Sequence, residues 1–213
     1  PTREPIDPVR FMSNYSSGKM GYAIAVAAKA KGANVELISG PVTINSIPDI
    51  KTTYVETSSE MYELVKKKVP DYDMFISTAA IADYKPANYS DTKYKKNANN
   101  INIEFTRGID ILETISNKHK NLFTVGFAAE TNSLNDNAEE KLKKKNLDII
   151  VGNIANHELK LGFESDYNEV IILSNTNSKK YDRDKKSNIA NSILDFISEE
   201  YSKKLSLVKK NAK

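Results

Sequence analysis

The stretch Asp7-Pro-Val-Arg-Phe-Met-Ser-Asn-Tyr-Ser-Ser-Gly-Lys-Met-Gly21 runs directly into an alanine-rich segment, residues 22–31. Residues 19–31 contain no proline and are rich in a strong helix former, so they predict a helix. The Asn, Ser and Gly residues ahead of it suit a tight turn and a helix N-cap. The first N–H groups of a helix have no partner within it, and the helix dipole is positive there. The stretch therefore predicts a phosphate or carboxylate site formed by Ser16, Ser17, Gly18, Lys19, Met20 and Gly21.

This glycine pair does not complete either familiar nucleotide-binding loop. Gly18-x-x-Gly21 lacks the earlier glycine of a dinucleotide fingerprint, and Met20 stands where a P-loop has Ser or Thr. The next predicted strand, residues 35–38, ends at Ser39-Gly40-Pro41 without the acidic residue that binds a ribose. A nicotinamide dinucleotide is thus disfavoured. A glycine turn that only lets a helix pack closely remains an open alternative on these residues alone.

The composition fits one globular domain and excludes several kinds of site. The 213 residues carry 31 basic and 28 acidic side chains, a net charge of +3 that does not argue for nucleic acid. There is no cysteine, and His119 and His157 lack metal-ligand spacing, so disulfides, zinc sites and histidine triads are disfavoured. No apolar run reaches the roughly 18 residues of a membrane span, and no signal peptide is visible. We expect a cytoplasmic protein and, because the sequence starts at Pro1, a piece of a longer one.

The periodicity of apolar residues predicts alternating strands and helices. Predicted strands are 35–39, 51–55, 73–80, 101–106, 122–129, 148–151 and 169–174, with 178–182 as a hairpin partner. Predicted helices are 19–31, 61–69 after a capping box at Thr57, 110–117 capped by Asp110, 135–146 and 188–201. Residues 1–7 predict an extended entry, 87–100 a mobile loop or lid, and 203–213 a basic tail.

This order of elements indicates an α/β fold. We expect a Rossmann-like, mostly parallel sheet with helices on both faces and a β-hairpin extension, forming one domain over residues 1–202. Ligands of such sheets bind beyond the carboxyl ends of the strands. The predicted strand ends are residues 77–80, residues 127–130 and Asn153.

The helix at residues 135–146 carries lysines with two possible roles. Glutamate–lysine pairs at 139/143 and 140/144 have the favourable i,i+4 order, whereas Lys141 and Lys145 face each other at the same spacing. They form either a solvated lysine-rich face or a clasp for a polyphosphate.

Taken together, these segments resemble one family, the phosphopantothenoylcysteine synthetase (phosphopantothenate–cysteine ligase) domain. That domain is usually the C-terminal half of a bifunctional bacterial coenzyme A enzyme. The matching motifs are Thr2-Arg-Glu-Pro-Ile-Asp-Pro-Val-Arg-Phe-Met-Ser-Asn14, Ser16-Ser-Gly-Lys-Met-Gly21, Gly32-Ala-Asn-Val35, Ser39-Gly-Pro-Val42, Ala79-Ala-Ile-Ala-Asp-Tyr84, Lys93-Tyr-Lys-Lys96, Val125-Gly-Phe-Ala-Ala-Glu-Thr131 and Gly162-Phe-Glu-Ser-Asp166. They occur in the expected order over about the first 170 residues.

The resemblance implies a two-step ligase that uses CTP and Mg²⁺. The first step makes 4′-phosphopantothenoyl cytidylate and releases pyrophosphate. In the second step the amine of L-cysteine attacks the acyl carbon and expels CMP. Fixed cations and Mg²⁺ suit the charge that builds on the phosphates. The resemblance also implies a homodimer, without a role for nucleic acid or membrane.

The resemblance also implies roles for individual residues. Asn14 matches the active-site asparagine, Lys93 the catalytic lysine on the loop, and nearby Arg10 suits an anionic partner. The nucleotide contacts match Ser77, Thr78, Ala79, Asp83, Lys93, Ile109, Asp110, Ile111, Leu112, Phe127, Lys141 and Lys145. Asp110 is explained equally well as a helix N-cap, and Phe127 as a core residue. No Mg²⁺ ligand is identified.

The sequence departs from the family pattern in two ways. The family has a glycine-ending strand ahead of the position of Thr2, and we expect that strand to be absent here. The flavin-dependent decarboxylase half, to which the resemblance implies a native fusion, is also missing, so this piece should not decarboxylate. Two other classes stay open: a Rossmann-type oxidoreductase, and a non-catalytic nucleotide-binding module. A nucleic-acid binder would depend on the tail at 203–213, which better suits a solubilising end.

Overall fold

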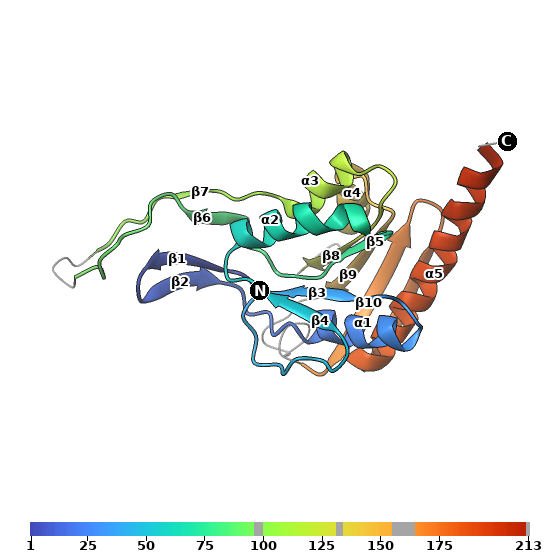
Figure 1. Cartoon of the computed structure of the whole chain (residues 1–213), viewed down its shortest axis with the longest axis horizontal. Helices are drawn as coiled ribbons and strands as arrows, with labels where there is room; N and C mark the ends of the chain where they lie inside the picture. Colours follow the sequence, from blue (N-terminus) through green and yellow to red (C-terminus); the bar gives the residue numbers. More distant parts are fainter. Residues whose placement is uncertain (96–99, 131–133, 155–164, 212–213) are drawn as a thin grey trace.

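A computed structural model of the chain describes residues 1–95, 100–130, 134–154 and 165–211. Its centre is a five-stranded sheet in the order β11-β10-β9-β8-β5 (Figure 1). The strands are β5 (Met74–Ser77), β8 (Phe123–Glu130), β9 (Ile149–Ile154), β10 (Tyr167–Ser174) and β11 (Ser178–Lys185). Strands β5, β8 and β9 are parallel, whereas the β10–β11 hairpin is antiparallel, so the sheet is mixed. The predicted α/β class and the hairpin are confirmed.

Helices cover both faces of this sheet, as predicted. Helices α1 (Lys19–Ala30) and α5 (Lys186–Asn211) pack on one face. Helices α2 (Ser58–Lys68), α3 (Ile111–Lys118) and α4 (Leu134–Lys144) lie on the other, as Figure 1 shows.

Successive side chains of a strand point to opposite faces of the sheet, so each strand contributes to the hydrophobic core on both faces. In β9, Ile149 and Val151 join the α1–α5 core, while Ile150 between them joins the α3–α4 core.

Local sequence signals place the helix starts. The Thr57 hydroxyl accepts a hydrogen bond from the backbone N–H of Glu60 at 3.1 Å, and the Glu60 carboxylate accepts one from the N–H of Thr57 at 3.2 Å. This is the predicted capping box of α2. Asp110 caps α3 by accepting from the N–H of Glu113 at 2.9 Å. Past α2 the chain makes a short 3₁₀ turn, Val69–Asp71, which contains Pro70.

The extended entry predicted at residues 1–7 is confirmed as β1 (Arg3–Asp7), which also forms an unpredicted hairpin with β2 (Arg10–Ser13). Two other predictions about the elements were wrong at their edges. The strand expected at 101–106 is only β7 (Phe105–Arg107), which pairs with β6 (Tyr84–Pro86). Helix α5 does not end at residue 201 but continues to Asn211, so most of the expected tail is helical. Residues 202–211 contain neither Gly nor Pro to stop it.

The two small ribbons together form a projecting arm. The arm comprises β1, β2, β6, β7 and the described residues between β6 and β7, and it extends away from the main sheet (Figure 1). Part of the expected lid, residues 96–99, lies outside the described residues, as do residues 131 and 162–164 of two matching motifs. No helix among the described ranges is both long enough and apolar enough to cross a bilayer.

A cavity of about 500 Å³ separates β5 from the small parallel sheet of β3 (Glu36–Ser39) and β4 (Lys51–Tyr54). Apolar side chains from α1, α2 and α5 line this cavity. In the described part of the chain, no strand pairs with the edge of β3 or of β5 that faces the cavity. The first residues lie beside the ends of these strands: the N–H of Thr2 donates to the carbonyl of Ala80 at 3.4 Å, and the Pro1 carbonyl lies against Gly40. One parallel strand running into Pro1 would fit this space.

We expect a short apolar extension ahead of Pro1 to stabilise the fold. Five or six β-forming residues, about the length of a typical strand, should raise Tm by at least about 5 °C, because they pair two sheet edges and fill an apolar cavity. Differential scanning calorimetry of both versions measures this. A Gly-Ser extension of equal length is the control. Equal Tm values for the two extensions would show that the cavity between β3 and β5 does not accept a β-strand.

Candidate active site

A second cavity, of about 390 Å³, lies where β5, β8 and β9 end. The starts of α1, α3 and α5 open onto it, and two lysines reach it from α4 and from the residue just after α4. It gathers most of the residues that the sequence nominated. Those lining it are Asn14, Ser16, Ser17, Gly18, Lys19, Met20, Gly21, Ser77, Thr78, Ala79, Asp83, Ile109, Asp110, Ile111, Leu112, Phe127, Lys141, Lys145 and Asn153. A cavity thus lies where the sequence predicted the site, beyond the carboxyl ends of the strands.

The start of α1 forms the floor of this cavity. Gly18 occupies the N-cap position with φ of 78°, a left-handed conformation that favours glycine. No described side chain caps this helix, and its first turn holds no acidic residue. Of the Asn, Ser and Gly residues predicted to suit the N-cap, it is Gly18 that occupies the position. The first N–H groups of α1 are therefore left without a side-chain acceptor among the described residues, which favours an anion.

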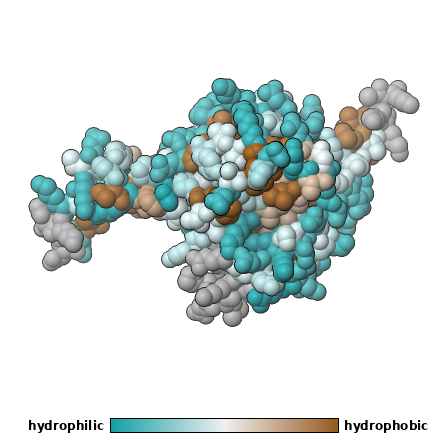
Figure 2. Space-filling model, turned by 60° about the horizontal axis from the view of Figure 1, so that its bottom comes forward, coloured by the Kyte–Doolittle hydropathy of each residue, from teal (hydrophilic) through white to brown (hydrophobic). Residues whose placement is uncertain are grey.

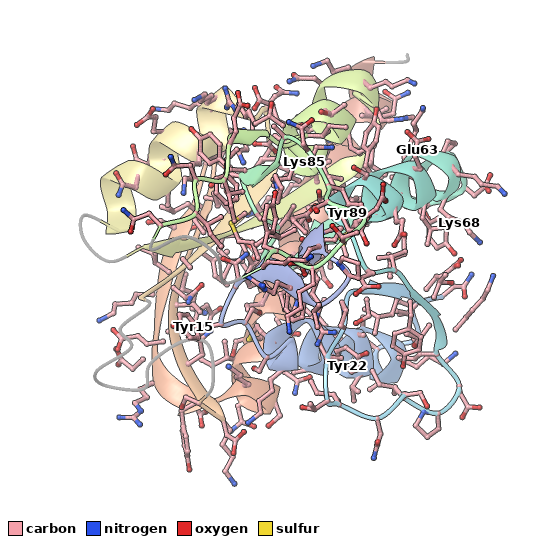
Figure 3. The ribbon with its side chains drawn as sticks, turned by 90° about the vertical axis from the view of Figure 1, so that its left-hand side faces the viewer. Tyr15, Tyr22, Glu63, Lys68, Lys85 and Tyr89 are labelled. Carbon is pink, nitrogen blue, oxygen red and sulfur yellow. The ribbon has the colours of Figure 1, made fainter. Side chains whose placement is uncertain are left out.

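Gly21 brings α1 close to the end of β5. A Cβ atom at this position would lie 2.5 Å from the hydroxyl oxygen of Thr78, well inside contact distance. The packing explanation of the glycine turn thus holds for Gly21, while the backbone conformation explains Gly18. A second contact holds α1 against the end of β3: the hydroxyl of Tyr22 (Figure 3) donates a hydrogen bond of 3.1 Å to the hydroxyl of Ser39.

Lysines reach the cavity from both faces of the sheet. From the α3–α4 side come Lys141 and Lys145. The Nζ of Lys145 lies 2.7 Å from Oδ2 of Asp110, whose other oxygen caps α3. The expectation that Lys145 only faces Lys141 was therefore incomplete, because sequence spacing within one helix does not show a partner on another.

On the α1–α5 side, Lys19 and Lys186 line the same cavity. Lys19 forms an ion pair of 2.5 Å with Asp166, and this contact holds the pKa of Asp166 below its usual range. Lys186, the first residue of α5, is only 6% exposed. Burial, followed by the nearby charge of Lys19, lowers the pKa of Lys186 to about 8, while Asp166 opposes that shift.

Asn14 and Asp83 lie at the end of β5. The Nδ2 of Asn14 donates to the carbonyl of Ala80 at 3.1 Å, which fixes the amide against the loop after the strand. The carbonyl of Asp83 accepts from the N–H of Gly108 at 2.7 Å, so that the loops on either side of the arm meet at the cavity. The side chain of Asp83 is exposed and lines the cavity.

Arg10 and Lys93, two of the three predicted catalytic residues, do not line this cavity. They lie together on the arm instead. The Arg10 guanidinium donates to the carbonyl of Tyr94 at 2.9 Å and approaches Asp7 at 3.4 Å. The Asp7 carboxylate also accepts from the N–H of Tyr94 at 3.2 Å, and Lys93 beside it is exposed. The β6–β7 arm therefore carries Lys93, and Arg10 beside it, away from the cavity of their own chain, and their catalytic roles stay predictions.

Sequence reasoning missed four residues that line the cavity: Arg107, Gly108, Asn168 and Lys186. Arg107 ends β7 and Gly108 follows it, and β7 forms only as part of the arm. Asn168 lies early in β10, and the helix that starts at Lys186 was predicted to begin two residues later. The sequence analysis assigned no element to residues 183–187, so Lys186 was not considered for a site.

The carboxylates suit a magnesium ion held mainly by a ligand's phosphates. Within the described ranges, no three His, Cys, Asp or Glu residues cluster closely enough to hold a metal by themselves. Asp110 already caps α3 and pairs with Lys145, which leaves Asp83 as the cavity carboxylate best placed for a cation. One or two carboxylates together with substrate phosphates are a usual Mg²⁺ environment.

Comparison with known proteins places this geometry among coenzyme A biosynthesis proteins. Residues 1–201 match the family model described as "DNA/pantothenate metabolism flavoprotein C-terminal domain". The chain is 42% identical over 200 residues to the coenzyme A biosynthesis bifunctional protein CoaBC of Vibrio vulnificus, covering 92% of this chain and 50% of that protein. It is 40% identical over 208 residues to CoaBC of Escherichia coli, covering 96% and 51%. The chain thus spans about half the length of these relatives.

The structural comparison agrees with the sequence comparison. The crystal structure of a CoaBC C-terminal domain superimposes with a TM-score of 0.78 at 37% identity, covering 92% of this chain and 89% of that one. A structure titled as a Cab2 mutant shares the fold, with a TM-score of 0.80 at 16% identity.

The close approach at Gly21 makes a testable prediction about stability. Replacing Gly21 by Ala should lower the free energy of unfolding by about 1–2 kcal/mol, since overpacking against Thr78 outweighs the better helix propensity of alanine. Urea unfolding measures the loss. In a double-mutant cycle Thr78→Ala should recover most of it, because the two sites are in contact. Additive losses would show that the contact between Gly21 and Thr78 does not set the approach of α1.

Proposed function

Since the chain belongs to the family of DNA/pantothenate metabolism flavoprotein C-terminal domains, we propose that it is a ligase of coenzyme A biosynthesis. It joins 4′-phosphopantothenate to L-cysteine at the expense of CTP. The observation that carries this proposal is the single cavity with a glycine-started helix on one side and lysines reaching in from both faces. A site with this much positive charge suits two anionic substrates that must react with each other.

The first step requires the stabilisation of negative charge. A carboxylate oxygen of phosphopantothenate attacks the α-phosphorus of CTP, the bond to the β-phosphate bridging oxygen breaks, and pyrophosphate leaves. The N–H groups at the start of α1 and the ammonium groups of Lys141 and Lys145 lie where they can bind the triphosphate. A bound Mg²⁺ supplies further charge neutralisation, and Asp83 is the side chain that would hold it on the protein.

The second step forms the amide. The amine nitrogen of cysteine attacks the acyl carbon of the acyl cytidylate, the acyl–oxygen bond breaks, CMP leaves, and the amine gives up a proton. The amide of Asn14 is fixed by the Ala80 carbonyl at the cavity edge. Its free oxygen can orient the incoming amine, while the loop at Ala79 and Ala80 presents backbone groups to the acyl chain.

The arm supports a dimer in which each cavity is completed by its neighbour. Arg10 and Lys93 lie outside the cavity of their own chain. The arm also exposes the apolar side chains of Val9, Phe11 and Phe105. Figure 2 shows brown, apolar patches on the projection. In Figure 3, where the arm faces the viewer, Lys85 and Tyr89 project from it. An exposed apolar surface of this kind is typical of an interface. We infer that Arg10 and Lys93 of the partner subunit enter each cavity.

The reaction itself gives the direct test. With CTP, Mg²⁺, phosphopantothenate and cysteine, the protein should release pyrophosphate and CMP in equal amounts with the amide product, as measured by ³¹P NMR. Omitting cysteine should leave pyrophosphate release limited to about one equivalent per site, because the acyl cytidylate stays bound. Amide formation without nucleotide consumption would exclude this mechanism. Nucleotide binding without any turnover would instead favour a non-catalytic module.

Mixing variants tests the shared site. Asn14→Ala and Lys93→Ala should each lose about 10²-fold in activity. After subunit exchange, their equal mixture should recover about a quarter of the normal activity, because half of the dimers then hold one intact site of two. Lys93→Ala mixed with Arg10→Ala is the matched control and should stay inactive, since both changes lie on the arm. If the first mixture gains nothing over its components, the arm does not act in the partner's cavity.

A further inference from the structure

We propose that Asp7, at the end of β1, is a positioning residue of the ligase: its carboxylate fixes Arg10 and Lys93 relative to each other, so that the arm brings both cations into the partner's cavity together. This inference rests on the proposed function and deepens it by a residue to which the sequence analysis gave no role. Arg10 and Lys93 come from segments far apart in the sequence. Two cations that serve one site therefore need a contact that joins their segments.

One carboxylate oxygen of Asp7 builds the turn that presents Arg10. Asp7 is only 2% exposed, although it lies on the projecting arm (Figure 1). Its Oδ1 accepts hydrogen bonds from the N–H of Val9 at 2.8 Å and from the N–H of Arg10 at 2.9 Å, across the turn between β1 and β2. An aspartate ahead of Pro8 suits such a turn, because its carboxylate reaches the N–H two residues further on. The turn fixes the backbone from which the Arg10 side chain extends.

The other carboxylate oxygen joins this turn to the segment that carries Lys93. The Oδ2 of Asp7 accepts from the N–H of Tyr94 at 3.2 Å and lies 3.4 Å from the Nε of Arg10. The Arg10 guanidinium in turn donates to the carbonyl of Tyr94 at 2.9 Å. The N–H of Tyr94 belongs to the planar peptide group that links it to Lys93. Asp7 therefore holds the backbone of Lys93 as well as the side chain of Arg10.

Burial distinguishes Asp7 from a substrate ligand. Its side chain is fully buried within its own chain, whereas the side chain of Arg10 is 41% exposed and Lys93 is exposed. Burial raises the pKa of Asp7, but the N–H groups of Val9 and Tyr94 and the charge of Arg10 outweigh it and hold that pKa below its usual range. The carboxylate is thus ionised at neutral pH and forms charge-assisted hydrogen bonds. Asp7 can act on a substrate only through the two cations.

The variant Asp7→Asn removes half of this contact. Its amide oxygen can still accept within the turn, whereas its NH₂ group donates and cannot replace the oxygen that faces Tyr94. The hydrogen bond from the N–H of Ser90 to the carbonyl of Ile6 at 3.1 Å stays, so the arm keeps its place against β1.

Steady-state kinetics measures the effect of that variant. A misplacement of about 1 Å can cost up to about 100-fold in rate, so kcat/KM should fall by at least about 10-fold in Asp7→Asn. Asp91→Asn, which removes the same charge at an exposed position of the arm, is the matched control and should stay within about 2-fold. An unaltered kcat/KM in Asp7→Asn, or an equal loss in Asp91→Asn, overturns the proposal.

Mixed subunits separate positioning from a structural defect. Asp7→Asn mixed with Asn14→Ala should recover about a quarter of the normal activity, because half of the dimers then pair an intact cavity with an intact arm. Asp7→Asn mixed with Lys93→Ala should gain nothing, since both changes lie on the arm. The reverse pattern would place the effect of Asp7 in its own cavity and overturn the inference. If Lys93→Ala complements Asn14→Ala but Asp7→Asn does not, this inference fails and the shared site stands.

Amide hydrogen exchange, followed by NMR, tests the contact without turnover. In Asp7→Asn the N–H of Tyr94 should exchange at least about 10-fold faster, the range for one charge-assisted hydrogen bond, while Ile193 in the core keeps its rate. Unaltered exchange at Tyr94 overturns the proposal. Should Asp7→Asn fail to fold, Tyr94→Pro removes the same N–H and should lose at least about 10-fold in kcat/KM relative to Tyr94→Ala, which keeps it. Equal activity of these two variants would also overturn the proposal, whereas an unmodified protein that makes no amide would refute the proposed function.

Discussion

The site depends on one electrostatic constraint, the meeting of helix starts and lysines at a single edge of the sheet. Parallel strands β5, β8 and β9 end there, and α1 and α3 begin there. Helix α3 lies in the crossover from β5 to β8, and such a crossover starts from the end of its first strand. Helix α2 caps itself with Thr57 and Glu60, and α3 uses Asp110, but no described side chain caps α1. The N–H groups at the start of α1 and the ammonium groups around the cavity both present positive charge, so both attract an anion that enters it.

The two explanations of the opening glycine motif turn out to be complementary. Gly21 serves packing, because a side chain there would collide with Thr78, and Gly18 serves the turn, because its φ is positive. Close packing is what brings the start of α1 to the end of β5. The same contact therefore builds the core and positions the anion site, which explains why the motif could not be assigned to one role from its letters.

Local patterns predicted the parts of the fold that are locally determined. The capping box at Thr57, the cap at Asp110 and the apolar strand of residues 122–129 all appear where the sequence placed them, since each depends on neighbours within a few residues. The cavity residues near strand ends followed from topology. The pairing of Lys145 with Asp110, the burial of Lys186 and the remoteness of Lys93 depend on contacts between distant segments, so a single sequence gave no signal for them.

A crystal structure with Mg²⁺ and a CTP analogue whose α–β bridging oxygen is replaced by methylene tests the central claim most directly. The account predicts the triphosphate across the strand ends, with phosphate oxygens about 2.7–3.2 Å from the first N–H groups of α1 and from the Nζ of Lys141. It also predicts the base beside residues 109–112. A nucleotide bound outside this cavity, or phosphates turned away from the start of α1, would contradict it.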